Sequence, residues 1–368
     1  MPFRITREKR DSAFLFRIRG GILEPIIEPV TTLVPASVGP AIATPSRDTA
    51  RRVDIIRRRM ADSSLLAYEA DWNHFTEWCA VAGHSPVPAS EDALLDYIDF
   101  CTGPNARSTA TRCPPKSAPL SLSSIRRRLA AITFAHNAAG LPLPAYPIVK
   151  DRLGVAEREI GTAKRQARPI TQVQLIQVLS LQPDSPAGRR NRALLLLGFT
   201  TGLRRAELVA LDRGHVSFLD EGVSVFVPKS KTDQGRNGRT VSVPYSPNAA
   251  TCTGTALRRW FAVLGDSDGA VFRRVLKGGT VSAQRLAPDA VSLLVKTSMS
   301  QLGEDPTEYS AHSLRAGLAT ALAREGVPLP QIMGQTGHAD VHTAIGYVRL
   351  GTAFRDNPVA KLGGLYPS

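Results

Sequence analysis

A histidine and an arginine three residues apart could together hold a phosphate group. They stand in the stretch AHSLRAG, residues 311–317, as His312 and Arg315. Residues three apart lie on one face of a helix, so this spacing brings an imidazole and a guanidinium side by side. Both groups can donate hydrogen bonds to anionic oxygens. The alternative is a solvated polar face at a capped helix start, and this stretch alone is compatible with both.

A second possible phosphate site is the stretch TTGLRRAEL, residues 200–208. A turn at Gly202 that opens a helix directs backbone N–H groups and the positive end of the helix dipole toward an anion. Arg204 would lie in the first turn, and Glu207, three residues later, could orient a guanidinium. An ordinary helix start with an ion pair explains the same residues, and taken alone it is the simpler explanation.

The loop PKSKTDQGRNGRTVSVP, residues 228–244, lies between two predicted strands and carries Lys229, Lys231 and Arg236. An ammonium at a hairpin can donate a proton to a leaving oxygen, whereas a guanidinium stays protonated. The alternative is a solvated hairpin tip.

Tyr347 follows His338 by nine positions in GQTGHADVHTAIGYVR, residues 334–349. His338 and His342 are four apart, as in some zinc sites. The zinc-protease pattern HExxH needs a glutamate where Ala339 stands, so we expect no metal. A lone tyrosine here is more often a half-buried aromatic residue than a nucleophile.

The composition indicates a globular chain that binds a polyanion. The chain has 368 residues, enough for two domains, and a formal net charge of +14. Such a charge favours nucleic acid as the partner. The longest apolar run, Leu194 to Phe199, is too short for a membrane span, and no signal peptide is expected. Four scattered cysteines indicate neither a metal nor a redox centre. We expect a cytoplasmic, nucleoid-associated protein.

Hydrophobic periodicity predicts a mainly α fold with a small antiparallel β-sheet. A helical domain begins near Ser64, and the next domain opens with Thr171 and Gln174 at capping-box spacing. Short β-branched runs after residue 214 predict the sheet, which makes the second domain α+β. The predicted parts are a disordered or variable arm (1–47), a helical domain (48–150), a basic linker (151–168), a second domain (169–351) and a tail (352–368).

Each of these signals is weak by itself, but their order and spacing are specific. "TGLRRAEL", a strand-flanked lysine, "HSLR", then "GH" with a tyrosine nine residues later resembles the tyrosine recombinase (phage integrase) family. The resemblance covers residues from about 60 to the end and implies a helical, SAM-like core-binding domain followed by the catalytic domain. It implies these roles: Arg204 and Arg315 as clamp arginines, Lys231 as the hairpin lysine, His312 and His338 as the two histidines, Tyr347 as nucleophile and Glu207 as support for the first arginine. The SKT context favours Lys231 over Lys229, although a change of one loop residue would exchange them.

The resemblance also implies the chemistry and the partners. Tyrosine attack on a phosphodiester would give a 3′-phosphotyrosyl link and a Holliday junction, without metal, ATP or cofactor. The partner would be double-stranded DNA with specific recombination sites, bound by a homo-tetramer formed from monomers or dimers, with possible accessory DNA-bending proteins and no membrane. The tail would dock on a neighbouring protomer. Candidate DNA contacts are Arg126, Arg127, Arg128, Lys164, Arg165, Arg168, Lys229 and Arg236.

Two other functions share part of this pattern. A type IB topoisomerase or hairpin telomere resolvase uses the same Arg, Lys, His and Tyr chemistry, but the two-domain layout and the HSLR…GH…Y spacing favour a recombinase. A catalytically inactive DNA-binding regulator is the alternative from another class. The complete set of site residues argues against it, because a decayed site should have lost at least one of them.

Overall fold

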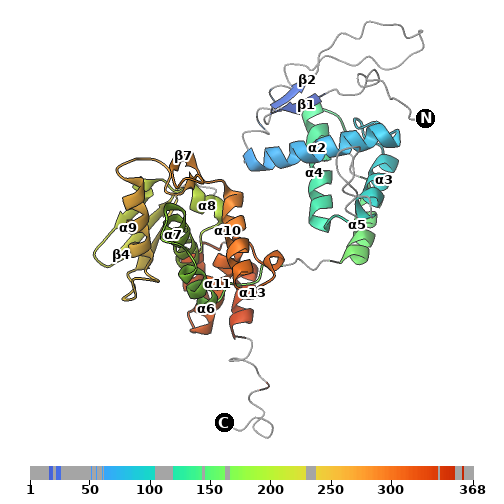
Figure 1. Cartoon of the computed structure of the whole chain (residues 1–368). Coiled ribbons are helices and arrows are strands. Elements are labelled where there is room, and N and C mark those ends of the chain that lie inside the picture. Colours follow the sequence, from blue (N-terminus) through green and yellow to red (C-terminus); the bar gives the residue numbers. More distant parts are fainter. Residues whose placement is uncertain are drawn as a thin grey trace, which may run out of the picture. The chain divides into compact units, whose positions relative to one another are not determined.

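Helices make up most of the described chain, and its strands pair into small antiparallel sheets. The structure is a computed structural model that describes residues 16–19, 22–25, 51, 55, 60, 62–103, 119–142, 146–161, 166–228, 238–338, 340–352 and 359. The chain divides into two units, residues 1–164 and 165–368, here called unit 1 and unit 2 (Figure 1). The predicted fold class, mainly α with a small antiparallel sheet, is confirmed.

Unit 1 is built from helices that pack around aromatic side chains. The helices are α2 (Asp62–Ala82), α3 (Glu91–Thr102), α4 (Leu122–Ala139) and α5 (Pro147–Ile160). Trp72 and Phe75 of α2 and Tyr97 of α3 are buried in this core. The Ser90 hydroxyl accepts a backbone N–H in the first turn of α3, and Gly140 ends α4 with φ +70°, in the left-handed region. Both residue types favour these positions at helix ends.

Part of the range predicted as a linker is helical. Its expected range, residues 151–168, begins inside α5, which packs against α3 and α4. Val149 and Ala156 are seven residues apart and both buried, so the segment has an inward helical face despite its charged residues. The density of charge concealed this face in the sequence.

The arm predicted over residues 1–47 contains regular structure that the sequence analysis did not anticipate. β1 (Phe16–Arg19) and β2 (Ile22–Pro25) pair antiparallel, with Arg19 opposite Ile22. The dipeptide between them is Gly20-Gly21, which is typical of two-residue hairpin turns. The two strands are too short to show a sustained period, and the Gly-Gly signal was overlooked.

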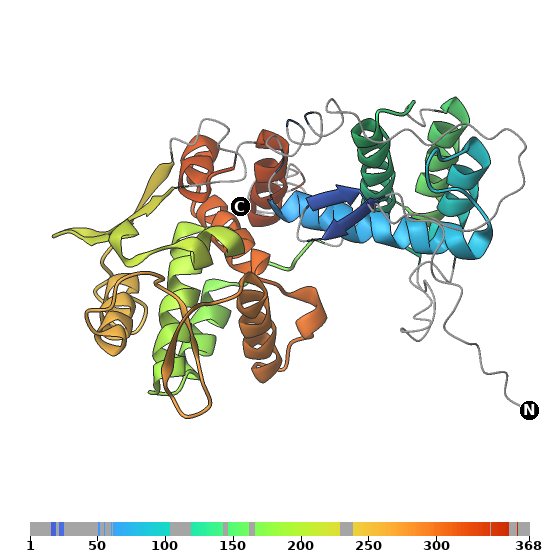
Figure 2. The same cartoon turned by 90° about the horizontal axis from the view of Figure 1, so that it is seen from above.

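Unit 2 is organised around one helix whose second half is buried on all sides. Its helices are α6 (Gln172–Ser180), α7 (Pro186–Thr201), α8 (Arg205–Ala210), α9 (Thr253–Leu264), α10 (Pro288–Gln301), α11 (His312–Arg324), α12 (Leu329–Thr336) and α13 (Val341–Thr352), with short 3₁₀ turns at Arg213–His215 and Pro306–Glu308. α7 contacts both α9 and α11 and lies between them (Figures 1 and 2). Residues 194–197 of α7 are all buried leucines, as a central helix requires. No described helix is long and apolar enough to cross a membrane.

The predicted sheet of unit 2 contains β3 (Val216–Phe218), β4 (Gly222–Val227) and β5 (Arg239–Pro244) in that order, all antiparallel. Val225 in the central strand pairs with Val216 on one side and Val241 on the other, and all three are buried. A separate hairpin joins β6 (Arg273–Val275) to β7 (Val281–Arg285). The lysine-bearing loop of the sequence analysis connects β4 to β5.

Candidate active site

Six of the predicted site residues meet in unit 2. They come from the start of α8, the start of α11, the turn after α12 and the middle of α13. The six are Arg204, Glu207, His312, Arg315, His338 and Tyr347. Five of the other predicted residues lie outside the described part of the chain, namely Lys164, Arg165, Lys229, Lys231 and Arg236.

Arg204 is held by Glu207 at the start of α8. The Glu207 carboxylate accepts the Arg204 backbone N–H at 3.0 Å and a guanidinium N–H at 2.8 Å, and its side chain is only 4% exposed. α7 ends at Gly202 with φ +60°, a left-handed conformation in which a Cβ would also press against the Thr336 side chain at 3.0 Å. This turn brings Arg204 to the end of α12, where Gly337 O lies 3.5 Å from its Nη2.

Arg315 is a buried guanidinium whose hydrogen-bonding capacity is not filled. Its exposed fraction is 1%. Nη1 donates to Gly202 O at 2.8 Å and to Thr336 O, and Nε donates to Nε2 of His338 at 3.1 Å. Nη2 has no hydrogen-bond partner among the described residues. Burial and the nearby charge of Arg204 lower the pKa of Arg315 to about 10, so it remains a cation at neutral pH.

The hydrogen bonds of His338 define its tautomer. Arg315 Nε can only donate, so Nε2 of His338 is the acceptor. The Thr336 hydroxyl donates to Ile332 O at 2.6 Å, so it accepts the Nδ1–H of His338 at 2.7 Å. Burial, followed by the charges of Arg315 and Arg204, lowers the pKa of His338 to about 3. His338 is therefore neutral, and its Nε2 lone pair orients Arg315.

Tyr347 is paired with His312 within the same site. The Tyr347 hydroxyl lies 2.5 Å from Nε2 of His312, and the tyrosine is 3% exposed. Burial raises the pKa of Tyr347, an effect that Arg315 partly offsets. Burial and the charges of Arg315 and Arg204 lower the pKa of His312. At neutral pH the phenol therefore carries the proton and the imidazole is ready to accept it.

Small residues allow α13 to bring Tyr347 this close to α11. Ala316, Ala319 and Ala323 lie on one face of α11 and form a buried cluster with Tyr347 and Ile332. Side chains of this size let two helices approach closely, and α11 and α13 are packed against each other. The alanine-rich sequence after His312 thus serves to seat the tyrosine.

The metal alternative gains no support from the geometry. His342, which follows His338 by four residues, is exposed on α13. Among the described residues no three His, Cys, Asp or Glu side chains are grouped as potential metal ligands.

Two contributors to this site were missed in the sequence. Thr336 fixes the His338 ring, and Arg239, the first residue of β5, donates to the carbonyls of Gln335 and Thr336. The available signals were a threonine two residues before His338 and an arginine at the end of the lysine loop. Neither has a spacing that marks it as part of a site.

The three consecutive arginines of α4 have different environments. Arg126 pairs with Glu157 at 3.3 Å and its side chain is 56% exposed, and Arg127 binds both oxygens of Asp71 while remaining half exposed. The Arg128 side chain is only 12% exposed, and Nη1 lies 3.0 Å from the ring of His74. Arg128 is therefore much less accessible than Arg126 and Arg127. Its direction on α4 points into unit 1, and the run of three arginines concealed this.

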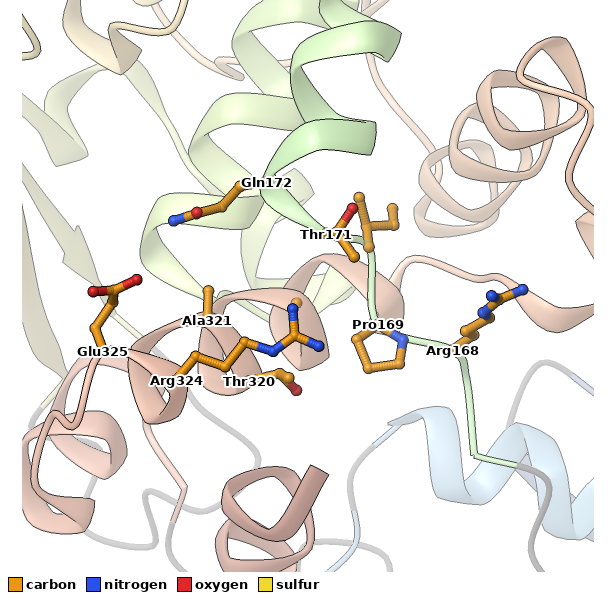
Figure 3. A pocket seen from close by; sticks show the side chains of 10 residues that line it. Arg168, Pro169, Thr171, Gln172, Thr320, Ala321, Arg324 and Glu325 are labelled. Atoms are coloured by element: carbon orange, nitrogen blue, oxygen red, sulfur yellow. The ribbon is translucent and has the colours of Figure 1, made fainter. Parts of the chain in front are cut away.

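Arg168 anchors the segment that leads into unit 2. Its side chain binds the carboxylates of Glu304 and Glu308, and its backbone N–H donates to Glu308 O at 2.9 Å. The following residues run along α11 beside a cavity of about 280 Å³ (Figure 3). Gly317 permits this crossing, because a Cβ there would lie 2.2 Å from Ile170 O. The crossing fixes α11, the helix that carries His312 and Arg315.

Comparison with known proteins gives a consistent picture. Residues 168–353 match the phage integrase family. The integrase/recombinase xerD homolog of Selenomonas ruminantium is 30% identical over 312 residues, which are 83% of this chain and 87% of that protein. Recombinase cre of Escherichia phage P1 is 26% identical over 336 residues, or 84% of this chain and 91% of that protein.

A solved structure supports the same fold. The XerH site-specific recombinase, bound to a palindromic difH substrate in a post-cleavage complex, aligns with a TM-score of 0.58. The alignment covers 86% of this chain and 84% of that chain, at 17% identity. At this identity the likeness concerns the fold alone.

Proposed function

The chain belongs to the phage integrase family, and on this basis we propose that Tyr347 is the nucleophile of a DNA strand-transfer site formed with Arg204, His312, Arg315 and Lys231. The protein is a site-specific tyrosine recombinase that cleaves and rejoins DNA. Nothing in the comparisons favours a topoisomerase, a telomere resolvase or an inactive regulator. The observation that carries the assignment of the site is the contact of the Tyr347 hydroxyl with His312, next to buried Arg315, whose Nη2 has no hydrogen-bond partner among the described residues.

In the proposed reaction the Tyr347 hydroxyl gives its proton to Nε2 of His312 and its oxygen attacks the scissile phosphorus. The bond to the 5′ oxygen breaks, and Lys231 protonates that oxygen as it leaves. A 3′-phosphotyrosyl link remains, which conserves the bond energy until another strand's 5′ hydroxyl attacks it. Exchange of the first pair of strands gives a Holliday junction, and the same reaction on the second pair resolves it.

The arginines balance the charge that develops during attack. A phosphodiester carries one negative charge, and the five-coordinate transition state carries a second. Arg204 and Nη2 of Arg315, which no described residue accepts from, supply donors for the nonbridging oxygens. In the free protein, Nε2 of His338 accepts from Arg315, so we assign His338 the task of orienting that arginine instead of direct donation to the phosphate. Glu207 does the same for Arg204.

The assembly is also part of the proposal. Unit 1 would act as the core-binding domain. Arg126, Arg127 and the candidate basic residues of the predicted linker (151–168) would contact the phosphate backbone. Four copies would pair two recombination sites in the cytoplasm at the nucleoid, with DNA-bending proteins as accessories. Because Tyr347 contacts His312 of its own chain, each protomer would cleave with its own tyrosine.

Covalent trapping tests the proposal. Wild type and Tyr347→Phe are incubated with nicked suicide substrates from DNA flanking the gene, without added metal, and resolved on a denaturing gel. An adduct with wild type alone supports Tyr347 and maps the crossover site. DNA binding without any adduct would remove the support for cleavage at this site, and an adduct that survives Tyr347→Phe would point to another nucleophile.

A further inference from the structure

A third arginine, Arg239, reaches the last turn of α12 from the first position of β5. Its guanidinium donates to the carbonyl oxygens of Gln335 at 3.2 Å and Thr336 at 3.3 Å, and Gly334 O lies at 3.5 Å. The last carbonyls of a helix have no partner within the helix and carry its negative dipole end. Arg239 therefore closes the end of α12 from a different element.

The same helix end also holds the two clamp arginines. Thr336 O accepts from Arg239 and from Nη1 of Arg315, and Gly337 O lies 3.5 Å from Nη2 of Arg204. Three guanidinium groups thus converge on carbonyls just before His338. A shift of this last turn would move the acceptor that fixes Arg315 and would move His338 with it.

Arg239 is packed here as tightly as it is hydrogen-bonded. Gly337 has φ +70°, and a Cβ at this position would lie 2.7 Å from both Cζ and Nε of Arg239. The glycine backbone therefore rests against the guanidinium. Nη2 of Arg239 is also 4.0 Å from a carboxylate oxygen of Glu207, the residue that holds Arg204.

Burial of the Arg239 cation at this position costs free energy, and a role in capping α12 does not by itself explain why a cation is used here. Nε of Arg239 is buried and has no hydrogen-bond partner among the described residues. Burial and the charge of Arg204 lower the pKa of Arg239, although Glu207 opposes this. A desolvated cation beside other cations is unfavourable in a helix cap, for which a neutral donor would suffice.

We propose that Arg239 is a positioning residue for phosphoryl transfer: by locking the last turn of α12 it sets the direction of the Arg315 guanidinium through Thr336 O and His338. This rests on the proposed function, because the direction of Arg315 matters for activity only if Arg315 binds the scissile phosphate. Lysine cannot replace Arg239, since one ammonium cannot lie flat on Gly337 while it donates to several carbonyls.

The test uses the full chain with Arg239→Met, Arg239→Lys and the matched control Arg273→Met. Arg273 is also buried and donates to main-chain carbonyls, those of Ser267, Asp268 and Ala270, but outside the site. Single-turnover cleavage of the suicide substrate is measured at saturating protein, with Kd from gel shifts. We expect both Arg239 variants to cleave about 10²-fold more slowly with little change in Kd, as for a catalytic group displaced by about 1 Å. Arg273→Met should cleave at the wild-type rate per folded molecule.

A substrate with a neutral methylphosphonate at the scissile position separates positioning from general damage. Without a charged nonbridging oxygen the reaction needs the clamp less, so the loss in Arg239→Met should shrink to less than about tenfold, and Arg315→Ala should show the same pattern. If Arg239→Met folds poorly, Gly337→Ala displaces the guanidinium without removing it and should behave alike.

Equal losses on both substrates, or an unchanged rate with the phosphate, would overturn the role of Arg239. Suppose that Arg315→Ala loses less cleavage rate on the methylphosphonate than on the phosphate while Arg239→Met loses the same on both. That result would reject this inference and leave the proposed function intact. Wild type that cleaves neither substrate would count against the proposed function and, with it, against this inference.

Discussion

The Tyr347 hydroxyl lies 2.5 Å from Nε2 of His312 in the free protein, with both residues on the same chain. Burial raises the pKa of the phenol and lowers that of the imidazole. The charge of Arg315 lowers both pKa values. The pair thus holds its proton on the tyrosine, and the direction of transfer is already defined.

The pH dependence of cleavage should report His312. Its pKa lies below the usual 6.5, so the imidazole is a neutral acceptor above that pH and is lost as a base when it becomes protonated in acid. We expect a constant single-turnover rate from pH 8 to about 6.5 and a fall of about tenfold per pH unit once the pH is below the His312 pKa. His312→Gln should lower the rate by about 10²-fold or more and remove this acid limb. A decline that starts above pH 6.5 would contradict the assignment.

Glu207 should be needed for the rate and much less for DNA affinity. It accepts from the backbone and the side chain of Arg204, so Glu207→Gln keeps one of these contacts and loses the charge. We expect single-turnover cleavage to fall about tenfold for glutamine and about 10²-fold for alanine, because Arg204 is released from its position. Gel shifts measure the DNA affinity of each variant, which should stay close to that of wild type. A rate in Glu207→Ala equal to wild type would show that Arg204 is positioned by other contacts.

Arg126 and Arg128, two residues apart on α4, should respond in opposite ways to replacement by methionine. Arg126 is exposed, so Arg126→Met should change stability by less than about 1 kcal/mol but weaken DNA binding and reduce the salt slope by about 1. The Arg128 side chain is only 12% exposed and lies among polar partners, so Arg128→Met should cost about 1–3 kcal/mol of unfolding free energy. Urea unfolding and salt-dependent gel shifts measure both effects. Equal behaviour of the two variants would contradict the assigned environments.

The sequence predicted which residues lie together in unit 2 better than it predicted their mutual contacts. The spacing of His312 and Arg315 correctly indicated one helical face, yet His312 contacts Tyr347, and Arg315 contacts His338. The contact of Arg239 with Thr336 O joins residues 97 positions apart. No local pattern encodes a guanidinium that caps a distant helix, so Arg239 could be found only from the fold.

Errors in the fold arose where charge and burial disagree. Residues 151–160 read as a basic connector because charged side chains outnumber the inward residues of α5. Arg128 stood among the candidate DNA contacts together with Arg126 and Arg127, but its side chain is much less exposed than theirs. The capping box of Thr171 and Gln174 was predicted correctly, because a cap depends on residues within one turn.

Removal of the tail should affect assembly and leave the single-site chemistry intact. Val359, Leu362 and Leu365 are the apolar residues that led us to expect docking on a neighbouring protomer, and all but Val359 lie outside the described residues. Deletion of 353–368 spares α13 and hence Tyr347. We expect weaker synapsis in gel shifts with two sites but unchanged cleavage of a single-site suicide substrate. Unchanged synapsis would refute docking by the tail.

The choice between Lys231 and Lys229 can be made by the leaving group. Both lysines lie outside the described residues, and the sequence context favours Lys231. A general acid is needed to protonate an alkoxide, but a thiolate leaves readily without one. We therefore expect Lys231→Ala to lower cleavage of the normal substrate by about 10²–10⁴-fold and to recover most of that loss when sulfur replaces the 5′ bridging oxygen. Lys229→Ala is the matched control, with a modest loss on both substrates. If only Lys229→Ala is rescued by sulfur, the roles are exchanged. If sulfur rescues neither variant, the proton comes from another group, and Arg236 would not replace it because a guanidinium stays protonated.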